Sequence, residues 1–236
     1  MGKLIAIRHG QSIWNAENRF TGWVDIDLSE KGKEEAKKSG ELLKKLNLNF
    51  DICFTSYLKR AINTLEIVLE VLGKNNEYRK AWELNERHYG ALTGLNKDEM
   101  KKTLGEEKVL EFRRSWDVRP KPLNKNNPYH PINIEAYKNI PKDKIPDTES
   151  LKDTFQRVIP YYEKNILDKL NKNIIIAAHG NSVRALCKYL FNIDNKKISK
   201  LEIPTGNPLL IKFDKKKKIE ESLYLDQKRA GDLITF

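Results

Sequence analysis

The stretch Lys3-Leu4-Ile5-Ala6-Ile7-Arg8-His9-Gly10 decides how the rest of the chain is interpreted. Its apolar residues run without interruption up to a polar end and a glycine, which is typical of a strand buried on both faces of a parallel sheet. The stretch Ile174-Ile175-Ile176-Ala177-Ala178-His179-Gly180 repeats the pattern. Because open α/β folds bind ligands at the carboxyl edge of the sheet, we expect His9 and His179 to meet at one such edge.

Short apolar runs alternate along the chain with segments whose apolar residues recur at helical spacing. We expect strands at about 3–8, 51–55, 78–84, 173–178, 208–213 and 220–225, and helices at about 29–46, 56–72, 96–104, 106–117, 151–170 and 181–191. Ser29 and Ser56 are the expected N-caps of the first two helices. The alternation predicts an α/β fold, a three-layer sandwich with a mainly parallel central sheet and helices on both faces.

The segment 119–149 differs from its surroundings in composition. It holds six of the nine prolines, together with many asparagines and lysines. A connection of this length is typical of a lid or a binding insertion. We therefore expect one domain over residues 1–236 that carries one lid-like insertion at about 119–149.

The net charge of +11 is compatible with nucleic acid, membrane phosphates or small anionic substrates as partners. The run Lys215–Lys218 is most simply a solvated hairpin turn. No apolar run approaches the length of a membrane span, and no signal segment precedes the first strand. With Cys53 and Cys187 interpreted as reduced core thiols, these features predict a cytoplasmic protein. His88 is expected in the core, and His130 has no assigned role.

Arginines near the first histidine indicate phosphate chemistry. Arg8 and Arg60 offer planar donors suited to forked contacts with phosphate oxygens, and their charges disfavour a proton on His9. His9 can then act as a nucleophile, and His179 adds a donor for the phosphoryl oxygens. Glu86 is the candidate acid for the leaving oxygen. No metal is needed, since these donors replace the magnesium of nucleotide kinases, and the sequence has no GxxxxGK[ST] loop.

A second group of cations comprises Arg87, Lys97, Arg113 and Arg114. Taken alone, the Arg113-Arg114 pair fits a solvated basic helix better than a binding site. The binding interpretation gains weight beside a phosphotransfer site, because a doubly anionic substrate needs positive charge away from the reacting phosphoryl group.

The chain resembles the 2,3-bisphosphoglycerate-dependent phosphoglycerate mutases of the histidine phosphatase superfamily. The matching blocks span about residues 3–225 in family order. They are Arg8–Asn15, Phe20–Trp23, Thr55–Ala61, Leu84–Gly90, Gly94–Lys97, Arg113-Arg114, Ala177–Ser182 and Ile203–Gly206.

The resemblance implies roles for individual residues. His9 becomes the phosphohistidine and Glu86 the proton donor and acceptor, with Arg8, Arg60 and His179 around the transferring phosphoryl group. Thr21 and Gly22 would meet the substrate carboxylate. The remaining implied substrate-binding residues are Gly10, Gln11, Ser12, Asn15, Arg87, Tyr89, Lys97, Arg113, Arg114, Gly180 and Asn181.

The implied activity is the interconversion of 3-phosphoglycerate and 2-phosphoglycerate in glycolysis and gluconeogenesis. It runs through a phosphohistidine, with 2,3-bisphosphoglycerate as primer and intermediate and with no metal. The family implies a homo-oligomer, a dimer or tetramer, with neither nucleic acid nor membrane as a partner. The chain departs from the family pattern at three places. Gln11 stands where many members have Glu, and Asn207 stands where a small or apolar residue is common. The C-terminal tail is short, and its length bears on the balance between mutase and phosphatase activity.

Two alternatives remain open at this point. A histidine-type sugar or glycerate phosphatase would use the same centre, although Lys97 and the Arg113-Arg114 pair argue against a broad phosphatase. A basic nucleic-acid-binding protein would use the lysine-rich surface, although no helix-turn-helix, RRM or zinc motif is recognisable. Mutase activity would identify the enzyme. A salt-dependent mobility shift of RNA in the absence of mutase activity would identify the nucleic-acid-binding protein.

Overall fold

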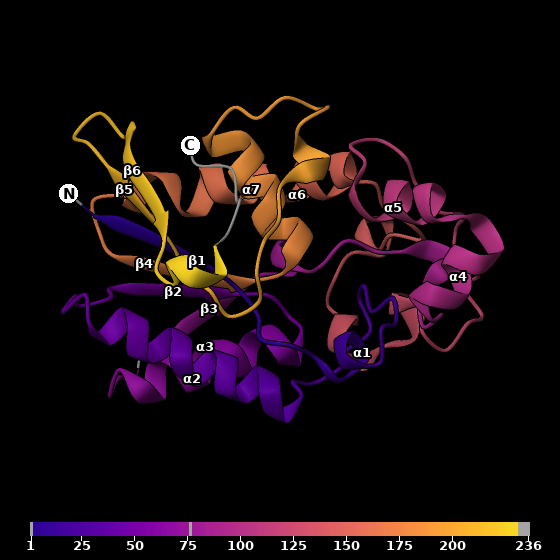
Figure 1. Cartoon of the computed structure of the whole chain (residues 1–236), viewed down its shortest axis with the longest axis horizontal. Helices are drawn as coiled ribbons and strands as arrows, with labels where there is room; N and C mark the ends of the chain where they lie inside the picture. The colour runs from indigo at the N-terminus through magenta and orange to yellow at the C-terminus, as the bar shows by residue number, and fades with distance from the viewer. Residues whose placement is uncertain (1, 76, 231–236) are drawn as a thin grey trace.

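A six-stranded sheet forms the centre of the computed structural model, which describes residues 2–75 and 77–230 (Figure 1). The strand order is β3-β2-β4-β1-β5-β6. Parallel pairing joins β1, β2, β3 and β4, whereas β5 is antiparallel to both of its neighbours. The strands are β1 (Lys3–Arg8), β2 (Ile52–Thr55), β3 (Tyr78–Lys80), β4 (Ile174–Ala178), β5 (Leu209–Phe213) and β6 (Ile219–Tyr224).

Helices cover both faces of this sheet, which confirms the predicted α/β architecture (Figure 1). The helices are α1 (Ile13–Ala16), α2 (Glu30–Lys44), α3 (Lys59–Val71), α4 (Lys97–Leu104), α5 (Glu106–Arg114), α6 (Leu151–Asn165) and α7 (Gly180–Leu190). Side chains of a strand alternate between the two faces. Leu4 therefore packs in the cluster under α6 and α7, while Ile5 packs in the cluster under α2 and α3.

The register of β1 against β4 brings the two histidines together. Arg8 is paired with Ala178, and the backbone N–H of His9 donates to the carbonyl of Ala178 at 2.9 Å. His9 and His179 therefore leave neighbouring strands at the same level, at the carboxyl edge. The sequence prediction of a shared edge is confirmed.

Some of the predicted ends of strands and helices were wrong, because turns and extended segments begin earlier or last longer than the sequence pattern predicted. The strand expected at 78–84 ends at Lys80 and continues into the 3-10 turn Trp82–Leu84. The helix expected to start at Ser56 begins at Lys59, with Leu58 at the N-cap position and no side-chain cap. The helix expected to run to residue 117 ends at Arg114, where the chain becomes extended at Ser115.

The proline-rich segment 119–149 folds into short 3-10 turns at Pro131–Asn133, Glu135–Tyr137 and Lys142–Lys144. Tyr137 and Ile140 are buried beside Trp23 and Leu58. The Tyr137 hydroxyl donates to the Trp23 carbonyl at 2.5 Å, so this segment packs on the loop that follows β1. That it opens as a lid, and that residues 1–236 form one domain, stay predictions.

The turn between β5 and β6 carries the lysine run. Lys215–Lys218 are exposed, and Asp214 accepts backbone hydrogen bonds from Lys216 and Lys218. The predicted solvated hairpin turn is confirmed. Within the described residues, no helix is both long enough and apolar enough to span a bilayer. The C-terminal tail, at 231–236, lies outside the described residues.

Candidate active site

His9 lies at the end of β1 and is buried. Its Nδ1 lies 2.6 Å from the carbonyl oxygen of Gly10, a contact that requires a proton on Nδ1. The Nε2 atom is then unprotonated and accepts a hydrogen bond from Arg60 Nε at 3.2 Å. Burial, and then the charges of Arg60 and Arg8, hold the pKa of His9 far below its ordinary value. His9 therefore presents a neutral ring with a lone pair on Nε2.

His179 follows β4 and packs edge-on against His9, with ring centroids 4.9 Å apart. The hydroxyl of Ser56 accepts from the backbone N–H of Leu58 and is hydrogen-bonded to His179 Nε2 at 2.7 Å. The other ring nitrogen, Nδ1, is buried without a hydrogen-bond partner among the described residues, so it is a polar atom that a ligand can engage.

Arg60 sits at the start of α3 and is 1% exposed. Its terminal nitrogens donate to the carbonyls of Val24 at 2.9 Å and Gly22 at 2.7 Å. Together with the bond to His9, these contacts fix all three nitrogens of the guanidinium. A buried cation without a carboxylate partner in hydrogen-bond contact is costly, which indicates that the site is built to receive an anion.

Arg8 and Glu86 lie on the other side of the pocket. Arg8 donates through NH1 to the Ile203 carbonyl at 2.7 Å, while its Nε is buried and has no partner in the described chain. Glu86 Oε1 accepts from the backbone N–H groups of Arg87 at 2.7 Å and Asn181 at 3.1 Å. One carboxylate oxygen is thus held by backbone donors, and the other oxygen is not used by these two bonds.

Arg157 on α6 holds the loop that carries Glu86 through hydrogen bonds to its backbone carbonyls. Its guanidinium donates to the carbonyls of Glu83, Asn85 and Glu86 at 2.6–2.9 Å and pairs with the buried carboxylate of Glu149. Arg157 therefore fixes the position of the Glu86 backbone.

Arg87 lies on this loop and is fully buried. It donates to the carbonyls of Glu149 and Val118, both at 2.8 Å, and its NH1 is buried with no partner among described residues. The guanidinium lies 5.7 Å from the ring centroid of Tyr89. Arg87 thus retains a donor that a ligand can use.

The outer part of the pocket is formed by α4 and α5. Lys97 at the start of α4 donates to the Arg19 carbonyl at 2.7 Å. Burial, and then Arg113 and Arg8, lower the pKa of Lys97 to about 8. Arg114 at the end of α5 pairs with Glu202 at 2.5 Å.

Two adjoining pockets of about 70 and 60 Å³ join these parts. The first is lined by Arg8, His9, Asn15, Arg19, Thr21, Gly22, Arg60, Glu86, Tyr89, Lys97 and Arg113. The second is lined by Arg8, Glu86, Tyr89, Arg113, Arg114, Gly180, Asn181, Arg184 and Glu202. Five cations and one carboxylate face the first pocket, so its field attracts anions strongly.

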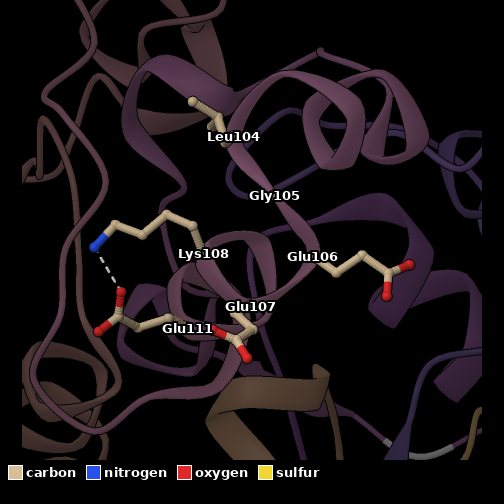
Figure 2. Close-up of a pocket in the computed structure, with 6 residues that line it drawn as sticks. All are labelled: Leu104, Gly105, Glu106, Glu107, Lys108 and Glu111. Atoms are coloured by element: carbon tan, nitrogen blue, oxygen red, sulfur yellow. Dashed lines mark hydrogen bonds and ion pairs between the residues drawn. The ribbon is translucent and has the colours of Figure 1, made fainter.

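A larger hollow of about 680 Å³ lies at the junction of α4 and α5 (Figure 2). Figure 2 shows its lining residues around Gly105, with Lys108 paired to Glu111. Glu106, Glu107 and Glu111 all border this hollow, and carboxylates repel phosphate. The two smaller basic pockets are therefore the candidate site, although the acidic hollow has the larger volume.

Most residues predicted from the sequence line these two pockets, but five do not. His179 packs edge-on against the His9 ring, and the Arg87 guanidinium packs over the Tyr89 ring. Gly10, Gln11 and Ser12 have structural contacts instead: a Cβ on Gly10 would lie 2.1 Å from the Gly32 carbonyl oxygen, Gln11 Oε1 accepts from Ser29, and Ser12 caps α1.

Three pocket-lining residues were missed by sequence reasoning: Arg19, Arg184 and Glu202. Arg184 had a usable signal, because it follows Asn181 by three positions on one helix and so shares its face. It donates to Asn181 Oδ1 at 2.7 Å and to the Leu201 carbonyl at 3.0 Å. Asn181 in turn donates to the Tyr89 hydroxyl at 3.0 Å.

The two other histidines are buried outside the pockets. His88 accepts from the backbone N–H of Gly90, and burial lowers its pKa to about 3. This confirms the expectation of a core residue. His130 lies in the segment 119–149, where it bonds Asp147 at 2.9 Å and holds that segment closed on itself.

Comparison with known proteins adds a family to this geometry. The family model of the histidine phosphatase superfamily (branch 1) matches residues 4–130 and 124–225. The chain is 61% identical to the 2,3-bisphosphoglycerate-dependent phosphoglycerate mutase of Pelagibacter ubique (strain HTCC1062), over 100% of both chains. It is 49% identical to the protein of that name from Hydrogenobaculum sp. (strain Y04AAS1), covering 95% of this chain and 92% of the relative.

Solved structures share the fold at lower identity. Bacillus stearothermophilus YhfR superposes with a TM-score of 0.69 at 22% identity, covering 93% of this chain and 95% of that one. A structure described as mycobacterial hydrolase 1 gives the same TM-score at 20% identity, with the same coverage. These likenesses concern the fold alone.

Proposed function

The chain belongs to the 2,3-bisphosphoglycerate-dependent phosphoglycerate mutases of the histidine phosphatase superfamily, and on this premise we propose that His9 carries the phosphoryl group. The reaction is the interconversion of 3-phosphoglycerate and 2-phosphoglycerate, a step of glycolysis and gluconeogenesis. The observation that carries the proposal is the state of His9, which lines the cationic pocket: its Nδ1 is bound to a carbonyl, so its lone pair lies on Nε2, and attack by Nε2 requires only that its hydrogen bond from Arg60 be released.

Transfer to His9 forms an Nε2–P bond and breaks the bond between phosphorus and the substrate oxygen. That oxygen takes a proton from Glu86, whose position is set by the backbone N–H groups of Arg87 and Asn181. The return step reverses this, with Glu86 accepting the proton of the attacking hydroxyl. Arg8, Arg60 and His179 stabilise the charge on the transferring group through donors that are already oriented.

The other predicted residues bind the rest of the substrate. Thr21, whose hydroxyl is buried without a partner in the described chain, and Gly22 meet the carboxylate. Arg87, Tyr89, Lys97, Arg113 and Arg114 hold the distal phosphate, with Asn15, Gly180 and Asn181 completing the lining. Gly10, Gln11 and Ser12 support the site through backbone packing and capping.

The residues present fit 2,3-bisphosphoglycerate as cofactor. Among the described residues, Arg8 Nε and the Thr21 hydroxyl are buried without a partner, and both residues line the first pocket. A ligand that carries phosphates and a carboxylate would satisfy them. When bound, 2,3-bisphosphoglycerate supplies the phosphoryl group that primes His9. No metal enters the proposal, because the arginines provide the positive charge that magnesium provides in kinases.

We further propose that the enzyme acts in the cytoplasm as a homo-oligomer, a dimer or tetramer, with small phosphoglycerates as its partners rather than nucleic acid or membranes. Support comes from the water-soluble substrates and from the family. Light scattering on the purified chain measures the oligomeric state directly.

A coupled assay tests the function. Conversion of 3-phosphoglycerate to 2-phosphoglycerate is followed with and without added 2,3-bisphosphoglycerate, and again in EDTA. We expect activity that rises with the primer and survives the chelator. Activity that vanishes in EDTA and returns with magnesium or manganese refutes the mechanism. Release of inorganic phosphate in place of 2-phosphoglycerate identifies a phosphatase instead.

A further inference from the structure

Three consecutive residues before β5 each contact a different arginine of the pocket. The carbonyl of Leu201 accepts from Arg184 at 3.0 Å, and the carbonyl of Ile203 accepts from Arg8 at 2.7 Å. Between them, the side chain of Glu202 pairs with Arg114 at 2.5 Å. This segment is therefore attached to the pocket along its length.

The backbone contacts hold the segment without help from the Glu202 side chain. The side chains of Leu201 and Ile203 are buried at 1% and 2% exposure, so they anchor the strand-like segment in the core. The Glu202 side chain points away from that core, is 53% exposed and lies at the pocket mouth. Its carboxylate can move or be replaced while the segment stays in place.

The charge balance of this pocket makes Glu202 unusual. The pocket that it lines carries the cations Arg8, Arg113, Arg114 and Arg184, with Glu86 as the other carboxylate. Glu86 is held by backbone donors and has the proton-transfer role proposed above. No comparable role accounts for Glu202, which neutralises a guanidinium that the distal phosphate would otherwise contact.

Resting on the proposed function, we propose that Glu202 is a specificity-determining residue whose carboxylate competes with the distal phosphate of bisphosphorylated ligands for Arg114. An incoming phosphate must displace the carboxylate from the guanidinium. This competition weakens the binding of 2,3-bisphosphoglycerate and leaves the phosphate that binds at His9 unaffected. Glu202 thus shortens the time for which 2,3-bisphosphoglycerate stays bound and lets its distal phosphate leave Arg114.

The test compares Glu202→Gln with a matched control, Glu221→Gln. Glu221 lies on β6, is 50% exposed and pairs with Lys212 on β5. The substitution Glu221→Gln therefore removes the same charge from a half-exposed ion pair that does not line the pocket. Dissociation constants are measured by calorimetry for 2,3-bisphosphoglycerate and for inorganic phosphate, at low and at high salt. Circular dichroism melting checks that each variant is folded.

For Glu202→Gln we expect 2,3-bisphosphoglycerate to bind about three- to fivefold more tightly, the upper part of the range for one partly exposed charge pair. Inorganic phosphate should bind as in the parent protein, and Glu221→Gln should change neither constant. The gain should shrink at high salt, because ions screen exposed charges. Equal affinity overturns the proposal. So does weaker binding, which would mean that the ion pair orients Arg114 for its ligand.

A double-mutant cycle identifies Arg114 as the shared partner. An Arg114→Ala background lacks the guanidinium with which Glu202 pairs, so Glu202→Gln should change the affinity by less than about twofold there. An undiminished gain overturns the competition for Arg114. The parent protein is assayed for mutase activity in the same preparation: a parent without mutase activity refutes the proposed function, and the inference with it. An active parent whose affinity does not respond to Glu202→Gln refutes the inference alone.

Discussion

The reaction centre at the sheet edge and the rim formed by α4 and α5 both present cations to one pocket, yet they hold them differently. At the centre, Arg60 is 1% exposed and all its nitrogens are bonded to fixed groups. At the rim, Arg114 is 20% exposed through its side chain and pairs with the half-exposed Glu202. Arg60 at the centre is held by two backbone carbonyls and a buried ring, whereas Arg114 at the rim is paired with one partly exposed side chain.

This difference matches two requirements of the reaction. Charge that develops during phosphoryl transfer is stabilised best by donors that need no reorientation. A bisphosphorylated intermediate that must present its other phosphate to His9 needs contacts that can be released and remade, and partly solvated ion pairs are weak enough for this. Under the proposed function, arginines therefore serve transfer at the centre and retention at the rim.

The largest effect is expected at the nucleophile. His9→Ala removes the atom that accepts the phosphoryl group, so turnover and labelling by radioactive 2,3-bisphosphoglycerate should both vanish. Acid quench and base quench of labelled protein provide the measurement, since phosphohistidine is labile to acid and stable to base. A label with that stability on the His9→Ala protein would place the phosphohistidine elsewhere, with His179 the next residue to examine.

The second effect concerns the proton. Glu86→Gln keeps the size and the acceptor oxygen for the two backbone donors but cannot exchange a proton. We expect kcat to fall on the order of 10²–10⁴-fold with a smaller change in KM. Steady-state kinetics on both phosphoglycerates measure this. A rise in KM with kcat unchanged would show that Glu86 binds substrate and does not transfer the proton.

At the rim, removing the arginine pair should separate retention from transfer. Each charge-assisted contact to phosphate contributes about 1.5–3 kcal/mol, so Arg113→Ala/Arg114→Ala should lower mutase flux at limiting primer on the order of 10²–10⁴-fold. Hydrolysis of the phosphohistidine involves water alone and should change little. Equal losses in both reactions would show that the pair acts on the transferring phosphoryl group or on folding. No change in either would make α5 a solvated basic helix.

The smallest effect is a pH dependence at Lys97. Its pKa is lowered to about 8, so the cation is present below that pH and is lost as pH rises through it. The KM for 3-phosphoglycerate should therefore rise by about three- to fivefold between pH 7 and pH 9, the scale of one partly screened charge. Lys97→Arg keeps its charge and should flatten the profile. An unchanged profile in that variant would assign the titration to another group.

Sequence patterns predicted that the residues of the candidate reaction centre lie together, because this depends on short-range features. The buried runs before His9 and His179 predict strands, and a parallel sheet places their ends at one edge. Residues Arg113 and Arg114 were found as a pair by family resemblance, although composition alone favoured a solvated surface. The fold class and most of the pocket lining followed from these observations.

What the sequence by itself determined is the alternation of elements, the two histidines at strand ends and the family. Only the tertiary structure decided that Ser56 is hydrogen-bonded to His179 instead of capping α3, and that the Gln11 side chain bonds Ser29 beside the pocket. It also decided that Glu202 meets Arg114. The reason is physical: these contacts join residues far apart along the chain, and no local periodicity encodes which side chain a packed neighbour will meet.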